Sequence, residues 1–182
     1  MTDNVTAEQI AINRAAWIAA LRSGKYAQGY GALRVRDGYC CLGVAEDLRD
    51  PTCWQSIDDQ NPLHATLYAT YFVNDVIVSA DDWESVHLQF TGLTRVTRRW
   101  LGVTESDPYV TVHASAFPRV ASDGSWSTQQ LSSLNDDHGF SFASIADVIA
   151  DQPTHWTGDV TAAASETQRR NQERQLPGSH RA

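Results

Sequence analysis

The sequence predicts an α+β fold, a compact single domain in which small antiparallel β-hairpins pack against several short helices. Two patterns support this class. Short segments with apolar residues at helical spacing are bounded by capping residues and by glycine or proline. Between them lie short apolar runs that alternate or flank an Asp-Gly pair. The chain has 182 residues, of which 42% are hydrophobic and 20% charged, as expected for one globular domain.

The first predicted element is a helix over residues 7–23. Thr6 can cap its N-terminus, with Gln9 in the capping-box position three residues later. Trp17 belongs to the apolar residues that recur at helical spacing and form one face. Gly24 supplies the signal that ends the helix.

A β-hairpin is predicted over residues 29–41, because two short apolar runs flank an Asp-Gly turn at positions 37 and 38. From Leu42 the pattern becomes helical until Pro51 ends it. A second hairpin is predicted over residues 71–78, where two apolar runs flank Asn74-Asp75.

The second half is predicted to contain a short helix, a strand and a helical pair. These are a helix after Thr94 that Gly102 stops, a strand over 109–113, a helix from Ser127 that breaks at 135–139, and a helix from Ser141 that Pro153 closes.

The globular domain is expected to span residues 1–156. Residues 157–182 lack aromatic side chains and carry few apolar ones, so they are predicted to form a flexible polar tail, with a solvent-exposed helix as the alternative. The predicted core consists of Trp17, Leu21, Leu42, Val44, Leu48, Trp100, Leu101, Leu134, Ile145 and Ile149.

The charge balance limits the classes of partner. With 22 acidic against 14 basic residues the formal charge is −8, which argues against nucleic acid, because neutralising phosphates needs a basic surface. No apolar stretch approaches the roughly 18–20 residues that span a bilayer. An N-terminus without a secretory pattern and an odd number of cysteines, 3, indicate a reduced cytoplasmic protein. No cofactor is predicted.

Cys40 and Cys41 lie immediately before a predicted helix, where the helix dipole can lower a thiol pKa. With His113 on the predicted strand they could form a cysteine-dependent hydrolase site. The alternative, which we favour, is that both cysteines are core residues. No metal site is predicted, because adjacent cysteines chelate a single ion poorly.

Two further groups of side chains could bind a ligand. Arg95, Arg98 and Arg99 share one short predicted helix and could clamp a phosphate or carboxylate, although an ordinary solvated face is the commoner outcome. Asn135 and Asp136 lie in a predicted turn, where such residues usually bond to the backbone.

Several of these motifs together resemble a family of small accessory proteins encoded by tailed bacteriophages and prophages, including those of actinobacteria. The matching stretches are Arg22-Ser23-Gly24-Lys25-Tyr26, Gly38-Tyr39-Cys40-Cys41-Leu42-Gly43-Val44, Trp100-Leu101-Gly102-Val103, and Leu134-Asn135-Asp136 with Gly139, Ser141-Phe142 and Ile145-Ala146-Asp147-Val148-Ile149. The resemblance covers residues 10–150 in outline. The chain departs from it in an insertion at about 55–92 and in the tail after residue 156. It implies a non-structural viral gene product, and it brings no catalytic residues.

We therefore expect a phage-encoded, non-enzymatic protein in the host cytoplasm. It would sequester a small, anionic, nucleotide-like ligand or inhibit a host protein, plausibly as counter-defence, and a homo-oligomer is left open. The alternative is the hydrolase with Cys40 or Cys41 and His113. The predicted ligand-binding residues are Arg22, Tyr26, Tyr39, Cys40, Arg95, Arg98, Arg99, Asn135 and Asp136.

Overall fold

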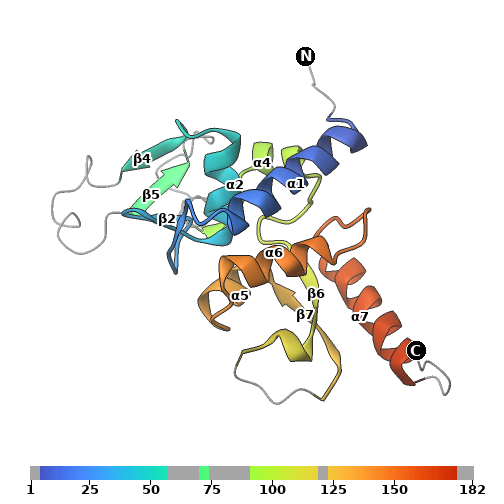
Figure 1. The fold of residues 1–182 in the computed structure, drawn as a ribbon. Coiled ribbons are helices and arrows are strands. Elements are labelled where there is room, and N and C mark those ends of the chain that lie inside the picture. The colour runs from blue at the N-terminus through green and yellow to red at the C-terminus, as the bar shows by residue number, and fades with distance from the viewer. Residues whose placement is uncertain (1–4, 57–69, 74–90, 119–122, 176–182) are drawn as a thin grey trace, which may run out of the picture.

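A computed structural model describes residues 5–56, 70–73, 91–118 and 123–175 of the chain. It confirms the α+β class: helices pack against a five-stranded sheet and a separate two-stranded sheet (Figure 1). The second strand of the hairpin predicted over residues 71–78 lies outside the described residues.

Helix α1 (Ala7–Arg22) begins and ends as its sequence predicts. The Thr6 hydroxyl accepts a hydrogen bond from the Gln9 amide at 3.2 Å, which satisfies one of the free donors of the first turn. Gly24 follows the helix in the left-handed conformation. The apolar face of α1 is buried at Trp17, whose indole N–H donates to the carbonyl of Cys41 at 3.0 Å.

The larger sheet has the strand order β1-β3-β2-β5-β4. Strand β1 pairs parallel with β3, and the other neighbours are antiparallel. The strands are β1 (Ala27–Gln28), β2 (Arg34–Val35), β3 (Gly38–Tyr39), β4 (Trp54–Ser56) and β5 (Thr70–Val73). The hairpin predicted around the Asp-Gly turn is therefore confirmed as β2–β3. Strand β5 lies between β2 and β4 and pairs with both. Both partners precede β5 by more than ten residues in the sequence.

Helix α2 (Cys41–Arg49) follows β3 directly and lies close to the backbone that precedes β2. Its Gly43 leaves no space for a side chain, because a Cβ built there would lie 1.8 Å from the carbonyl oxygen of Leu33. The same carbonyl accepts the Cys40 amide at 3.0 Å. This close approach places the N-terminus of α2 against the sheet.

Helix α4 (Arg95–Leu101) has Thr94 at its N-cap and a left-handed Gly102 at its C-terminus, as predicted. A fully buried carboxylate, Glu46, joins α4 to α2. Glu46 accepts the Thr94 amide at 2.7 Å and the Thr97 hydroxyl at 2.5 Å. Arg49 lies 3.5 Å from the same carboxylate.

The smaller sheet contains one element that the sequence analysis assigned wrongly. Ser127 was expected to begin a helix, but residues 126–130 form strand β7 (Trp126–Gln130), which pairs antiparallel with the predicted strand β6 (Tyr109–His113). A short 3-10 turn, η2 (Ala114–Ala116), follows β6. Helix α5 (Leu131–Asp136) starts only after β7. Pairing with β6 satisfies the backbone of residues 126–130, and that non-local partner decides their conformation.

Side-chain amides occupy the outer edges of this two-stranded sheet. The Gln152 amide accepts the Thr111 N–H at 3.0 Å and donates to the Thr111 carbonyl at 3.1 Å. On the other edge, the Asn171 amide accepts the Trp126 N–H at 2.8 Å and donates to the Trp126 carbonyl at 3.1 Å. Each amide thus bonds as a neighbouring strand would.

Helix α6 (Phe142–Ala150) is capped by Ser141 as predicted, and it packs against α1. Of the two alternatives for residues 157–182, the flexible tail is wrong for residues 160–175, which form helix α7 (Val160–Gln175). This helix packs on β6 and β7 (Figure 1). Apolar burial is indeed small, since Ala163 is the one buried residue of α7. Hydrogen bonds to the sheet and an ion pair with Asp151, at the end of α6, hold the helix instead.

The predicted core is largely confirmed. Eight of the ten predicted residues are buried, while Leu48 and Trp100 are partly buried and pack against the core. Within the described ranges no helix combines the length and the apolar character needed to cross a membrane.

Candidate functional site

The two adjacent cysteines are core residues, as the favoured interpretation held. Cys40 is 3% exposed, and its sulfur accepts the Gly43 N–H at 3.3 Å as the N-cap of α2. Cys41 is fully buried and donates to the Leu131 carbonyl at 3.5 Å. Burial raises the pKa of the Cys40 thiol to about 12 and the pKa of Cys41 well above its usual value.

His113 does not complete a catalytic pair. Its ring nitrogen Nδ1 bonds with the Ser115 hydroxyl at 2.5 Å, and its ring packs edge-on against Trp126 with centroids 4.9 Å apart. Nucleophilic catalysis needs a thiolate within hydrogen-bonding reach of a base. The raised thiol pKa values and these contacts of His113 argue against the hydrolase.

We predict slow alkylation of Cys40 and Cys41 in the folded protein. At pH 8, iodoacetamide should modify both at least about a hundredfold more slowly than in the unfolded chain, because the reactive thiolate is suppressed by burial. Peptide mass spectrometry after timed quenching measures this, with guanidinium-unfolded protein as the control. Rapid labelling of either cysteine in the native protein would contradict this prediction and support the cysteine-dependent hydrolase.

Tyr26 and Tyr39, both predicted as ligand-binding residues, converge on one carboxylate. Asp47 accepts hydrogen bonds from the Tyr26 hydroxyl at 2.9 Å, the Tyr39 hydroxyl at 3.3 Å and the Trp54 indole N–H at 2.8 Å. The Arg34 guanidinium lies over the Tyr39 and Trp54 rings, 5.0 and 5.6 Å from their centroids. Burial and the Asp47 carboxylate raise the pKa of Tyr26 to about 12. This aromatic cluster already contains its own cation, which fits a structural role.

Asn135 and Asp136 hold the loop that follows β1. The buried Asn135 amide accepts from Gln28 at 3.0 Å and donates to the Gly29 carbonyl at 2.8 Å. Asp136 accepts the Gly31 N–H at 3.1 Å. Both side chains are thus engaged with backbone or a neighbouring amide, as turn residues usually are.

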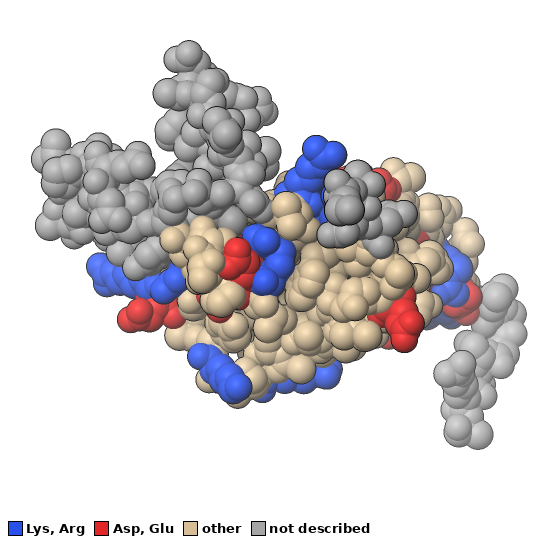
Figure 2. Space-filling view, turned by 90° about the horizontal axis from the view of Figure 1, so that it is seen from above, with Lys and Arg blue, Asp and Glu red and all other residues tan. Residues whose placement is uncertain are grey.

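The arginine clamp expected on α4 stays a prediction. Arg98 turns to the Thr104 carbonyl at 2.6 Å, while Arg95 and Arg99 are exposed. In the face shown in Figure 2, basic and acidic side chains are interspersed around a broad uncharged area.

Arg22, also predicted to bind the ligand, forms an exposed ion pair with Asp147 of α6 at 2.5 Å. The predicted residues therefore lie in separate clusters, and Tyr26, Cys40 and Asn135 engage different partners.

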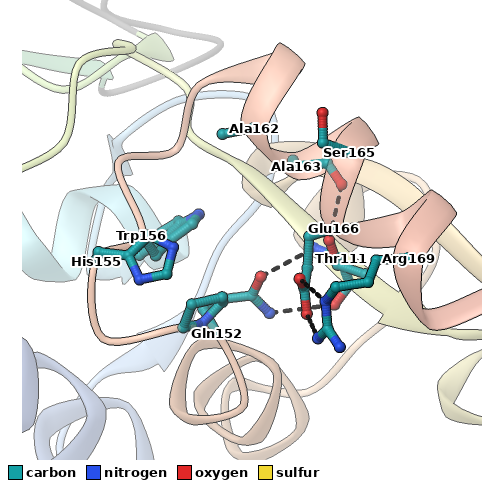
Figure 3. A pocket seen from close by; sticks show the side chains of 10 residues that line it. Thr111, Gln152, His155, Trp156, Ala162, Ala163, Ser165, Glu166 and Arg169 are labelled. Atoms are coloured by element: carbon teal, nitrogen blue, oxygen red, sulfur yellow. Dashed lines mark hydrogen bonds and ion pairs between the residues drawn. The ribbon is translucent and has the colours of Figure 1, made fainter. Parts of the chain in front are cut away.

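A cavity lies elsewhere, between α7 and the segment that follows α6 (Figure 3). We call it the α7 cavity, and its volume is about 300 Å³. The lining residues are Thr111, Gln152, Pro153, His155, Trp156, Ala162, Ala163, Ser165, Glu166 and Arg169. Sequence analysis missed this site because it treated residues beyond 156 as a tail. Asp159 gave an overlooked local signal: its carboxylate accepts the amides of Thr161 and Ala162 at the start of α7.

The polar wall of the α7 cavity is a network of fixed charges. Glu166 accepts hydrogen bonds from Arg169 at 2.6 and 2.8 Å and from Arg170 at 2.5 Å. These arginines hold the pKa of Glu166 at about 2, so its carboxylate stays ionised at physiological pH. Gln152 is fixed by its bonds to the edge of β6 at Thr111.

The opposite wall combines an aromatic ring with an imidazole. Trp156 is 5% exposed, and its indole N–H donates to the Tyr109 carbonyl at 2.7 Å. The guanidinium of Arg14 lies 5.2 Å from the centre of its ring. His155 is exposed, and Figure 3 shows its ring beside Trp156, across the cavity from Glu166 and Arg169.

No cluster of three or more His, Cys, Asp or Glu side chains suited to a metal ion occurs in the part of the chain that the structure describes. The α7 cavity also lacks an activated nucleophile among its described lining residues. Its geometry is that of a small binding site with pre-positioned polar groups.

A protein-family comparison places this small α+β domain. The model of the family described as "Domain of unknown function (DUF8296)" matches residues 11–153, and the chain belongs to that family. No curated protein and no solved structure matched the chain. The matched region ends at Pro153, so α7 and most of the α7 cavity's helical wall lie beyond it.

Proposed function

We propose that this protein is a non-enzymatic accessory protein of a tailed bacteriophage, which acts in the host cytoplasm by binding and sequestering a small nucleotide-like ligand. The observation that carries the proposal is the α7 cavity, a concave site whose polar side chains are held by other parts of the fold. The motifs shared with phage accessory proteins supply the biological context. Buried, protonated cysteines support binding over catalysis.

The dimensions of the cavity favour a small ligand. A volume of about 300 Å³ lies at the lower end of the range for small-molecule sites. Pro153, Ala162 and Trp156 offer apolar contacts for a planar ring. Such a surface combined with fixed hydrogen-bonding groups suits a heterocyclic base better than an aliphatic chain.

The charges in the cavity specify where an anionic group would lie. His155 stands on the wall opposite Arg169 and Glu166, and the Arg169 guanidinium is already paired with Glu166 and Glu173. Glu166 is ionised and would repel additional negative charge at its own wall. A ligand with one phosphate or carboxylate group on the His155 side, away from Glu166, therefore fits better than a triphosphate.

Native mass spectrometry of protein purified from its bacterial host tests this proposal. The expected result is a stoichiometric mass increment and a small molecule that is released on denaturation. Ala162→Phe should abolish the increment, because the new ring projects from an exposed position into the cavity. The matched control is Ala164→Phe, an exposed position on the same helix outside the cavity lining, which should retain it.

A bare mass for the wild-type protein would overturn sequestration of a ligand. Equal retention in the Ala162→Phe and Ala164→Phe proteins would overturn the assignment to the α7 cavity. Thermal unfolding of both variants verifies that the substitutions leave the fold intact.

The second candidate is inhibition of a host protein. It is favoured by large apolar side chains on the surface, Ile12, Tyr30 and Val96, which are 55%, 58% and 48% exposed. Exposed apolar groups contribute to protein interfaces when they are contiguous. A host protein that stays bound in the native spectrum, with no small molecule, would favour this candidate.

A further inference from the structure

Helix α7 differs from the rest of the domain in what holds it. The family match ends at residue 153, before α7 begins at Val160. Of its 16 residues only Ala163 is buried. Helices of globular domains are usually held by a buried apolar face, whereas α7 depends on polar contacts. The domain and the helix are therefore joined mainly by hydrogen bonds and ion pairs.

Arg170 is the centre of these polar contacts. Its guanidinium bonds to the Asp151 carboxylate at 2.6 Å and to the Asp151 carbonyl at 3.0 Å. It also lies over the Trp126 ring, 4.3 Å from the centroid. The Asp151 side chain is 58% exposed, so salt can screen this ion pair.

Two side chains of α7, Thr167 and Asn171, also bond to the sheet. The Thr167 hydroxyl lies 2.9 Å from the Thr128 hydroxyl and 3.3 Å from the Thr111 hydroxyl. Asn171 bonds to both backbone groups of Trp126. All of these groups can bond to water instead when they separate, so each lost hydrogen bond is replaced.

The segment before α7 provides a defined hinge. The Thr157 and Gly158 carbonyls accept the amides of Thr104 and Tyr109, each at 2.8 Å, and anchor the chain to the domain. Gly158 has a φ of +75° and lies against Pro108. Asp159 then caps α7. The firm attachment thus ends one residue before the helical cap.

Helix α7 also carries contacts that support it away from the sheet. Arg169 pairs with Glu166 and with Glu173 at helical spacings of three and four residues. Such pairs stabilise a helix without a tertiary partner. The helix can therefore move as a unit.

We propose that α7 is a lid, which swings as one helix about the Gly158–Asp159 hinge to open and close the α7 cavity. Ala162, Ala163, Ser165, Glu166 and Arg169 supply the moving wall, while Thr111, Gln152 and Trp156 stay with the domain. The identity of the ligand under this lid rests on the proposed function. Its motion is testable without any ligand.

Hydrogen exchange of the full-length protein, followed by mass spectrometry, tests the lid. The amides of α7 should exchange at least about tenfold faster than those of α6, because opening α7 leaves the domain folded. Raising sodium chloride to 1 M should accelerate α7 exchange further, through screening of the Arg170–Asp151 pair. The rate for α6 serves as the internal control.

The second experiment uses an engineered disulfide between α7 and β7. The double substitution Thr128→Cys with Thr167→Cys places two thiols where the hydroxyls lie 2.9 Å apart. In the oxidised protein, α7 exchange should slow to within about threefold of α6, and reduction with dithiothreitol should restore it.

Equal exchange of α7 and α6 in the wild-type protein, unchanged by salt, would overturn the lid. Fast exchange of α7 that persists in the oxidised disulfide variant would also overturn it, since it would reflect fraying of the helix itself. Neither result depends on ligand retention in the Ala162→Phe and Ala164→Phe proteins. Failure of the lid and failure of the binding site are thus distinguishable.

Discussion

Gly43→Ala is expected to destabilise the protein by about 3–5 kcal/mol, near the upper end for a single added methyl group. The new Cβ would lie 1.8 Å from the Leu33 carbonyl oxygen, so α2 or the backbone before β2 has to shift. That shift also stretches the bond from the Cys40 amide to the same carbonyl. Urea unfolding followed by circular dichroism gives the free-energy change.

The expected loss of stability in Gly43→Ala is opposite in sign to the effect of helix propensity. An alanine in place of glycine inside a helix normally adds about 1 kcal/mol of stability, through helix propensity alone. The control is Ala19→Gly on the exposed face of α1, which measures the helix-propensity difference between alanine and glycine. This substitution should lower the unfolding free energy by about 1 kcal/mol. A Gly43→Ala protein as stable as the wild type would contradict the close contact with Leu33.

Glu46→Ala is expected to cost about 3–5 kcal/mol, because it leaves buried partners of a carboxylate without a counterpart. The Thr94 amide and the Thr97 hydroxyl would lose their acceptor, and Arg49 would lose the carboxylate 3.5 Å away. Glu46→Gln keeps the shape and one acceptor oxygen, so it should cost less. Equal unfolding free energies for Glu46→Ala and the wild type would contradict this role.

The same carboxylate predicts a dependence of stability on pH. Burial is the largest influence on Glu46 and raises its pKa above the usual 4.5, against the lowering effect of Thr97, Thr94 and Arg49. Between the unfolded and the folded pKa the native state binds more protons, so this contribution to stability falls as pH rises through that window. Urea midpoints at several pH values should show this slope in the wild type, and Glu46→Gln should lack it.

The parts of the fold that were predicted correctly depend on local signals. Thr6, Thr94 and Ser141 cap helices where the sequence places them, and Gly102 ends one. Each of these side-chain caps is a bond between residues three positions apart, so a short stretch of sequence contains both partners. The buried apolar positions follow from the same short-range spacing.

The parts that were missed depend on distant partners. Residues 126–130 become a strand because β6 pairs with them, and α7 is ordered by contacts with Asp151 and Trp126. The predicted ligand-binding residues were dispersed for the same reason, since residue type alone does not tell which side chains meet. Nothing in the local pattern distinguishes a polar helix that packs on a sheet from one in solvent.

The side-chain amides of Gln152 and Asn171 limit strand addition between copies of this chain. They occupy the backbone groups of Thr111 and Trp126 at the outer edges of the β6–β7 ribbon. An unoccupied strand edge is a template on which another chain can add a strand and begin to aggregate. Asn171 belongs to α7, so each departure of that helix would bare the β7 edge at Trp126. While α7 is docked, its Asn171 therefore blocks strand addition at this edge, and other residues of the same helix line the α7 cavity.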